Sequence, residues 1–113
     1  MGDRVSIQFA KDHGDWEDKS AVLFSHWGGM EFVNYAWAYA RRLAREREGK
    51  HTSPLDRLEA GTVMVDFIVS CIGRERDRVE SDLYITCSEH EGDNSDNGHH
   101  IISLNLVEEE LER

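Results

Sequence analysis

The chain has few residues that would cross-link it or interrupt it. Its 113 residues include two cysteines, Cys71 and Cys87, and one proline, Pro54. Because the cysteines do not form a C-x-x-C pair, the sequence gives no support for a thiol-redox centre or a cysteine-based zinc site. Both fall within apolar patterns, so we expect small buried side chains in a reduced, cytoplasmic protein, with a disulfide between them left open.

Long hydrophobic segments are also lacking. The longest apolar run, residues 62–72, is interrupted by Asp66 and Ser70 and is too short to span a bilayer. A strand pattern already starts at Val5, so we expect no secretory signal. The sequence therefore predicts a single domain over residues 1–113, with no membrane contact.

Basic residues are scarce in the second half of the chain. Residues 51–113 hold five basic and fifteen acidic side chains, whereas residues 1–50 hold eight of each, and the net charge is -10. An acidic surface repels phosphate backbones and anionic lipids, which argues against nucleic acid and membranes as partners. A basic protein partner, or simple solubility, fits this charge better.

Two short segments near the start of the chain are predicted to be strands. Apolar residues alternate with polar or small ones over residues 5–10 and again over residues 21–25. The charged residues 11–20 between them read as the loop of a hairpin. Pairing Ile7 with Phe24 keeps the apolar side chains on one face.

Two helices are predicted to follow this hairpin. Apolar residues recur at helical spacing from Met30 to about Glu48, and again from Pro54 to near Gly73. In the second helix we assign two side chains to the apolar, core-facing stripe: Val65 and Val69. We expect two others to lie on the exposed, polar stripe: Asp66 and Ser70.

The rest of the chain predicts a second hairpin. Residues 82–87 and 101–107 alternate, and the acidic loop EHEGDNSDNGHH separates them. The element order ββααββ predicts an α+β fold with two layers, in which both helices cover one face of a four-stranded antiparallel sheet.

The outer face of this sheet would carry an apolar patch. Its members are Leu23, Trp27, Tyr84, Ile101 and Val107. Large exposed apolar patches often mark self-association, so we expect a homo-oligomer, specifically a dimer through this face.

The turn before the first helix is the candidate binding site. Gly28 and Gly29 would let a ligand approach the backbone closely, and the N–H groups at a helix start carry partial positive charge. The hairpin register brings Arg4 near Trp27. We therefore expect an anionic small molecule, such as a phosphate or a carboxylate, to bind at Arg4, His26, Trp27, Gly28, Gly29 and Glu31.

The same turn also fits a purely structural explanation. Two glycines can simply permit a tight strand-to-helix connection, and Arg4 with Trp27 can form a stabilising cross-strand pair. The sequence leaves both interpretations open.

Metal binding and catalysis have less support. His90, His99 and His100 fall in or beside the acidic loop, but that loop is expected to be flexible, and a calcium-loop pattern fails because its twelfth position is Leu104. Ser25 and His26 are strand neighbours, whose side chains point to opposite faces. We therefore assign no metal, no cofactor and no catalytic residue, and leave open whether the protein is an enzyme.

Three short motifs occur in order along the chain. They are a Gly-x-Arg start, a His-Trp-x-Gly turn followed by Glu, and an Asp-Asn pair before an apolar strand. The matching residues are Gly2, Arg4, His26, Trp27, Gly29, Glu31, Asp96 and Asn97. In these motifs the chain resembles a group of small uncharacterised phage, prophage and archaeal proteins, a resemblance that implies no particular activity.

The function that we expect is that of a small cytoplasmic binding or accessory protein, with its anion site at the glycine turn. The alternative is an acidic interaction or inhibitor protein that engages a basic protein partner, since the acidic excess lies in residues 51–113.

Overall fold

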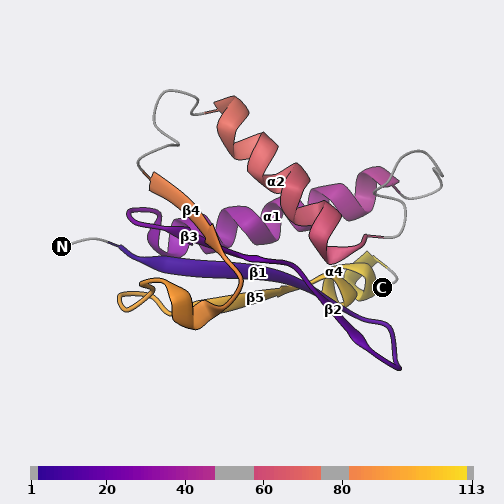
Figure 1. Cartoon of the computed structure of the whole chain (residues 1–113). Helices are drawn as coiled ribbons and strands as arrows, with labels where there is room; N and C mark the ends of the chain where they lie inside the picture. The colour runs from indigo at the N-terminus through magenta and orange to yellow at the C-terminus, as the bar shows by residue number, and fades with distance from the viewer. Residues whose placement is uncertain (1–2, 48–57, 75–81, 112–113) are drawn as a thin grey trace.

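The computed structural model describes residues 3–47, 58–74 and 82–111. Within these residues the chain is α+β, with one curled, largely antiparallel sheet and three α-helices (Figure 1). The strands are β1 (Val5–Asp12), β2 (Glu17–Lys19), β3 (Val22–Ser25), β4 (Leu83–Thr86) and β5 (His99–Ser103). The helices are α1 (Gly29–Arg47), α2 (Ala60–Arg74) and α4 (Leu104–Leu111), and a single 3-10 turn, η1, covers Glu89–Glu91.

Strand β1 lies at the centre of the sheet. It pairs in antiparallel fashion with β2 and β3 along one edge and in parallel with β5 along the other. Strand β4 pairs antiparallel with β3. The sheet order is therefore β5–β1–β3–β4. Strand β2 lies on the same edge of β1 as β3 but pairs with the last residues of β1, whereas β3 pairs with the first.

The second hairpin that the sequence predicted is wrong, and so is the fully antiparallel four-stranded sheet. Strands β4 and β5 run in the same direction at opposite edges of the sheet, because β3 is antiparallel to both β1 and β4. Three strand spacings, about 14 Å, separate them, and the crossover segment (residues 87–98) can span that distance. Figure 1 shows this segment on one side of the sheet and helices α1 and α2 on the other.

The predicted register of the first hairpin is wrong by one residue. Ile7 pairs with Leu23, not with Phe24. The register also changes by one residue between the β1–β2 and β1–β3 pairs, which identifies a bulge at Ser20. There the Ser20 N–H donates to the Phe9 carbonyl, while the Phe9 N–H donates to Ser20 Oγ. Strand β2 lies inside the segment predicted as a loop. Phe24 pairs with Ser6, and its ring lies on the sheet face away from the helices, where Gly92 packs against it.

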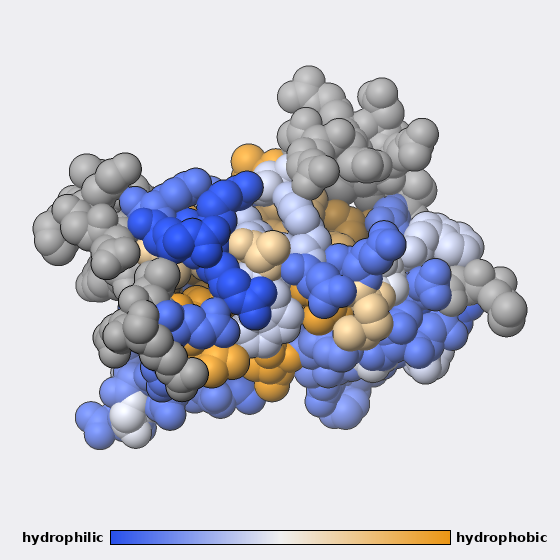
Figure 2. Space-filling view, turned by 180° about the vertical axis from the view of Figure 1, so that it is seen from behind, coloured by the Kyte–Doolittle hydropathy of each residue, from blue (hydrophilic) through white to orange (hydrophobic). Residues whose placement is uncertain are grey.

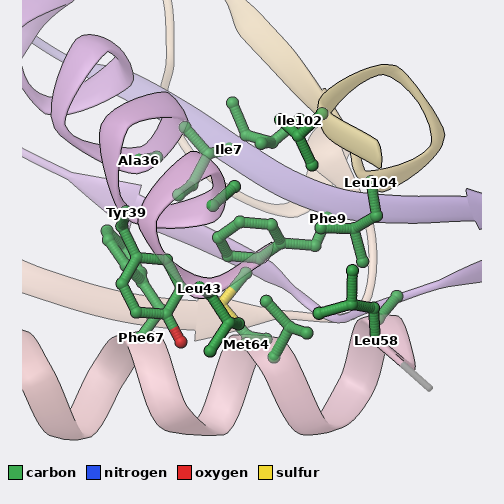
Figure 3. Close-up of a cluster of buried hydrophobic side chains, with 14 of the residues drawn as sticks. Ile7, Phe9, Ala36, Tyr39, Leu43, Leu58, Met64, Phe67, Ile102 and Leu104 are labelled. Atoms are coloured by element: carbon green, nitrogen blue, oxygen red, sulfur yellow. The ribbon is translucent and has the colours of Figure 1, made fainter. Parts of the chain in front are cut away.

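The hydrophobic core lies between the other sheet face and the three helices. Figure 3 shows Phe9 of β1 among side chains from α1, α2 and α4. The Phe9 ring meets Phe67 at 5.6 Å and Tyr39 at 6.2 Å in edge-to-face geometry. Each such contact contributes about 0.5–1.5 kcal/mol beyond area burial.

Helix α2 is rotated relative to the prediction. Its exposed face carries two apolar side chains, Val65 and Val69, each 62% exposed. The predicted solvent stripe turns toward α1 instead, where Asp66 accepts a hydrogen bond from the Tyr39 hydroxyl and Ser70 Oγ lies 3.1 Å from the Tyr35 hydroxyl. The two tyrosines provide polar partners at the helix interface, which is why the polar stripe is half-buried.

The start of α2 also differs from the prediction. Pro54 lies outside the described residues, but Leu58 has a φ of 48°, which is not helical, and the helix begins at Ala60. Asp18 of β2 caps it from a distance, because its Oδ2 accepts the Ala60 N–H at 2.8 Å. The sheet thus fixes where α2 begins.

The last alternating segment is a helix, not a strand, beyond Ser103. Ser103 Oγ accepts the Leu106 N–H at 3.2 Å and so caps α4. Leu104 and Val107 lie on the same side of α4, where both are buried in the core. Helical periodicity here overrides the alternation that predicted a strand.

The apolar patch predicted on the outer sheet face is not formed. Leu23 and Val107 are buried in the core, and Tyr84 is half-buried. Of the five residues, Trp27 and Ile101 are exposed. A homodimer through this face stays a prediction, with fewer apolar side chains to support it.

The remaining surface is mostly polar. Figure 2 shows the molecule from behind, with hydrophilic residues predominating and apolar ones in small separate patches. None of the described helices combines the length and the apolar character needed to cross a membrane. Cys71 is half-buried and Cys87 exposed, and no disulfide joins them, so the prediction of a buried side chain is wrong for Cys87.

Candidate functional site

The turn between β3 and α1 has the tight geometry that its two glycines suggest. A Cβ added at Gly28 would lie 2.6 Å from Phe32 Cβ and 2.7 Å from Ser25 Oγ. Gly29 has a φ of 57°, and an added Cβ would lie 3.1 Å from Asp3 Cβ. Both positions are therefore filled by the chain itself, so the structural role of the two glycines is sufficient to explain them.

A carboxylate already occupies the turn. Asp82, just before β4, accepts hydrogen bonds from the N–H groups of His26 and Trp27 through Oδ1, at 3.2 and 3.1 Å. The Ser25 hydroxyl donates to the same carboxylate at 3.3 Å and accepts the Gly28 N–H at 2.9 Å. The turn thus has the anion-binding chemistry that the sequence suggested, but an internal side chain uses it.

The start of the chain lies beside the turn, as the sequence analysis expected. The Asp3 N–H donates to the His26 carbonyl at 3.1 Å, and the Gly29 N–H donates to the Asp3 carbonyl at 2.9 Å. These two bonds bring the backbone around Arg4 next to the first turn of α1.

The Arg4 side chain, however, does not stack on Trp27. Its Nη1 donates to Asp93 Oδ2 at 2.6 Å, and its Nε lies 3.9 Å from Asp96 Oδ2, which also accepts the Arg4 N–H. Hydrogen bonds from Ser95, with the Arg4 charge as a lesser cause, lower the pKa of Asp93. Carboxylates of the crossover segment therefore neutralise the cation that was expected to hold an anion.

The three remaining predicted site residues have separate surroundings. The His26 ring packs against Tyr84, with a centroid distance of 5.1 Å. Trp27 is 63% exposed, and Glu31 is exposed in the first turn of α1. The structure thus brings the backbone of the six predicted residues together, but the side chains of Arg4, His26 and Trp27 have different surroundings: the crossover segment, β4 and solvent, respectively.

A polar network that the sequence analysis missed lies under the crossover segment. Because β5 pairs in parallel with β1, Ser6 and His99 are direct neighbours, with 2.7 Å between Ser6 Oγ and His99 Nδ1. On the other side of the ring, Nε2 lies 3.2 Å from Gln8 Oε1 and 3.3 Å from Glu89 Oε2. Asn94 Nδ2 donates to Ser6 Oγ at 2.9 Å. No sequence pattern pointed to this network, because the hairpin hypothesis paired residues 101–107 with residues 82–87 and left His99 in the loop.

Burial affects the chemistry of the His99 ring. Only 12% of its side chain is exposed, and desolvation lowers its pKa, with the Glu89 carboxylate acting in the opposite direction. The imidazole is therefore neutral near pH 7. Ser6, His99 and Glu89 have the composition of a nucleophile, a base and an orienting acid. Ser6 is fully buried, however, so in this conformation its hydroxyl holds the fold together and cannot reach a substrate.

The three loop histidines do not converge on a metal. His90 is exposed near Glu89, His99 points to the face with Ser6, and His100 Nε2 lies 2.7 Å from the Asn97 carbonyl. Within residues 3–47, 58–74 and 82–111, no group of three histidine, cysteine or acidic residues could hold a metal ion. The crossover segment also forms hydrogen bonds with Arg4, Tyr84 and Ser6, in contrast to the flexible loop that was expected.

Comparisons of the whole chain with protein-family models, with curated proteins and with solved structures found no match. The resemblance to small phage, prophage and archaeal proteins therefore stays a prediction.

Proposed function

We propose that this chain is a small binding protein that holds a cationic group of a protein partner, a lysine or arginine side chain, against the glycine turn. The binding surface is acidic and aromatic, and its members are Asp3, Trp27, Glu31, Asp93 and Asp96. This proposal combines the predicted position of the site with the basic partner of the alternative hypothesis.

The observation that carries the proposal is the internal Arg4 contact. Asp93 and Asp96 are spaced to bind the guanidinium of Arg4 at this surface, and the two carboxylates together retain one negative charge that Arg4 does not neutralise. Residues 82–111 contain eight acidic and no lysine or arginine side chains, so the local field favours a cation. Trp27 adds an exposed ring face, which attracts cations with about 0.5–1 kcal/mol at such sites.

A labelled poly-arginine peptide, followed by fluorescence anisotropy, tests this proposal. We expect salt-sensitive binding to the wild type and an affinity about two- to fivefold lower for Trp27→Ala, the equivalent of one exposed cation–π contact. Trp16→Ala is the matched control, because Trp16 is 57% exposed at the distant β1–β2 turn. Equal losses for both tryptophan variants, or no binding by the wild type, would contradict the proposal.

A second candidate is the anionic small molecule, supported by the N–H groups that hold Asp82. Removal of this carboxylate in Asp82→Ala leaves the Trp27 N–H for inorganic phosphate, whereas the His26 N–H still donates to the backbone carbonyl of residue 82. Phosphate should then raise the melting temperature of the variant more than that of the wild type. Arg4→Ala separates the two candidates. It should weaken binding of phosphate but not of the poly-arginine peptide, because it removes a positive charge.

We include a cytoplasmic location in the proposal. No disulfide joins Cys71 and Cys87, and Cys87 is exposed, which suits a reducing compartment.

A further inference from the structure

The hydrogen bonds around His99 determine which ring nitrogen carries the proton. The Gln8 amide nitrogen donates to the Ser20 carbonyl at 2.8 Å, so its oxygen faces His99 Nε2. Glu89 presents a second acceptor to Nε2. With two acceptors there, Nε2 bears the hydrogen, and Nδ1 must accept one from the Ser6 hydroxyl.

These bonds form a directed chain of donors. Asn94 donates to Ser6 Oγ, Ser6 donates to His99 Nδ1, and His99 Nε2 donates to Gln8 and Glu89. Asn94 and Glu89 belong to the crossover segment, whereas Ser6 and Gln8 belong to β1. The neutral ring therefore connects the segment to the centre of the sheet.

Protonation of His99 would break this chain at its middle. Nδ1 would become a donor facing Ser6 Oγ, and the Ser6 hydroxyl hydrogen would have to leave its acceptor inside a fully buried site. The charged and titratable groups that act on the ring are Glu89, His90, His100 and Lys19. Of these, the Glu89 carboxylate favours the charged ring, but desolvation outweighs it and lowers the pKa of His99.

We propose that Ser6, His99 and Glu89 form an acid-sensitive clasp, which holds the crossover segment on the sheet at neutral pH and releases it when His99 gains a proton. Release separates Gly92 from the Phe24 ring, on which it packs closely, and Asp93 from the Tyr84 hydroxyl, which accepts its N–H at 2.9 Å. It also moves Asp93 and Asp96 away from Arg4. An effect on the cation site rests on the function proposed above, but the clasp itself does not.

Amide hydrogen exchange on the full chain, without any partner, tests the clasp independently of that function. The amides that report on release are those of Asp93 and Asn97, because their acceptors are the Tyr84 hydroxyl and the Arg4 carbonyl outside the segment, and the reference amides lie in the middle of α1. After correction for intrinsic exchange rates, the protection of the segment amides should fall by up to about tenfold per pH unit below the ordinary histidine pKa of about 6.5. The α1 amides should change much less over the same range.

His99→Asn is the decisive variant, since its side-chain oxygen can still accept the Ser6 hydrogen bond but cannot be protonated. It should abolish the pH dependence of the segment, while the control His90→Gln, which alters an exposed histidine near Glu89, should leave it intact. If His99→Asn fails to fold, the nitrogen chemical shifts of the wild-type His99 ring still test the proposal. The clasp requires these shifts to show the neutral Nε2–H tautomer at pH 7. The Nδ1–H tautomer, a pH-independent segment in the wild type, or an unchanged pH dependence in His99→Asn would each overturn the proposal.

Discussion

Gly28 and Gly29 serve the turn for different physical reasons. Gly28 lacks space for any side chain, because Phe32 Cβ and Ser25 Oγ lie within 2.7 Å of where a Cβ would be. At Gly29 the nearest atom to an added Cβ is Asp3 Cβ at 3.1 Å, which is a looser contact, but the φ of 57° is one that other residues rarely adopt. Gly61, near the start of α2, has neither constraint, since no heavy atom lies within 4 Å of an added Cβ.

Gly28→Ala should therefore lower the free energy of unfolding by about 1–3 kcal/mol through overpacking of the turn. Gly61→Ala, the control, should raise it by up to about 1 kcal/mol, because alanine favours the helix. Urea unfolding followed by circular dichroism measures both changes. Equal stability for Gly28→Ala and the wild type would show that the turn can rearrange.

Tyr39 makes the stability of the folded protein fall at alkaline pH. Burial, followed by the hydrogen bond to Asp66, raises the pKa of the Tyr39 hydroxyl far above its ordinary value of about 10. A raised pKa in the folded state means that this contribution to stability is complete below about pH 10 and is lost as the pH rises further, because the unfolded chain loses its proton first. The stability of Tyr39→Phe should fall less steeply above pH 10 than that of the wild type, as measured by urea unfolding at several pH values. Parallel curves for the two proteins would contradict this assignment.

Single residues also show how far the sequence could predict the site. The position of the turn and its neighbour, the start of the chain, follow from hydrophobic alternation and from Gly28-Gly29. The partner of Arg4 did not follow, because Asp93 and Asp96 are 89 and 92 residues away and reach it only through the crossover. Ser6 and His99 were missed for the same reason.

At the scale of elements, α4 depends on the cap at its start. Ser103 ends β5 and caps α4, since its hydroxyl accepts the Leu106 N–H. Strand and helix therefore meet without an intervening loop. Asn105 adds a second attachment, because it exchanges two hydrogen bonds with the Asp12 backbone at the end of β1.

Loss of the cap should weaken the helix measurably. Ser103→Ala removes the acceptor and should cost about 1 kcal/mol of unfolding free energy, whereas Ser103→Asp retains an acceptor and should cost less. Urea unfolding of the two variants compares them directly. A Ser103→Asp protein as unstable as Ser103→Ala would mean that the hydroxyl acts in the strand and not as a cap.

Elements differed in how well the sequence predicted them. The helix predicted from Met30 to about Glu48 appears as Gly29–Arg47, because its apolar spacing is long and regular. The last segment was misread because Leu104 and Leu106 alternate as in a strand, while Leu104 and Val107 also fit a helix. Alternation also says nothing of strand direction, which is why the parallel pairing of β5 with β1 escaped notice.

At the scale of the whole molecule, charge opposes the association of two copies, whereas exposed apolar area favours it. A net charge of -10 makes two copies repel each other, and the apolar side chains left on the surface are scattered. Of the predicted patch residues, a dimer through the outer sheet face would have Trp27 and Ile101 to use, which are 63% and 46% exposed.

Sedimentation equilibrium tests the predicted dimer. The prediction requires a concentration-dependent dimer for the wild type and a monomer for Ile101→Glu, because an added carboxylate would have to be buried between two acidic surfaces. Glu109→Gln, on the exposed side of α4, serves as a control that should not lower association. A monomeric wild type would remove the dimer from consideration.

The position of β1 also has a consequence for how the protein is made. A ribosome releases β1 well before β5, because the paired residues Ser6 and His99 are 93 positions apart, yet the two strands are hydrogen-bonded neighbours. Until β5 emerges, the nascent chain has an incomplete sheet, and the edge of β1 exposes unpaired N–H and C=O groups that resemble an aggregation template. Completion must wait for a contact between segments that are far apart in the sequence, so synthesis should be the stage at which this protein most needs a chaperone.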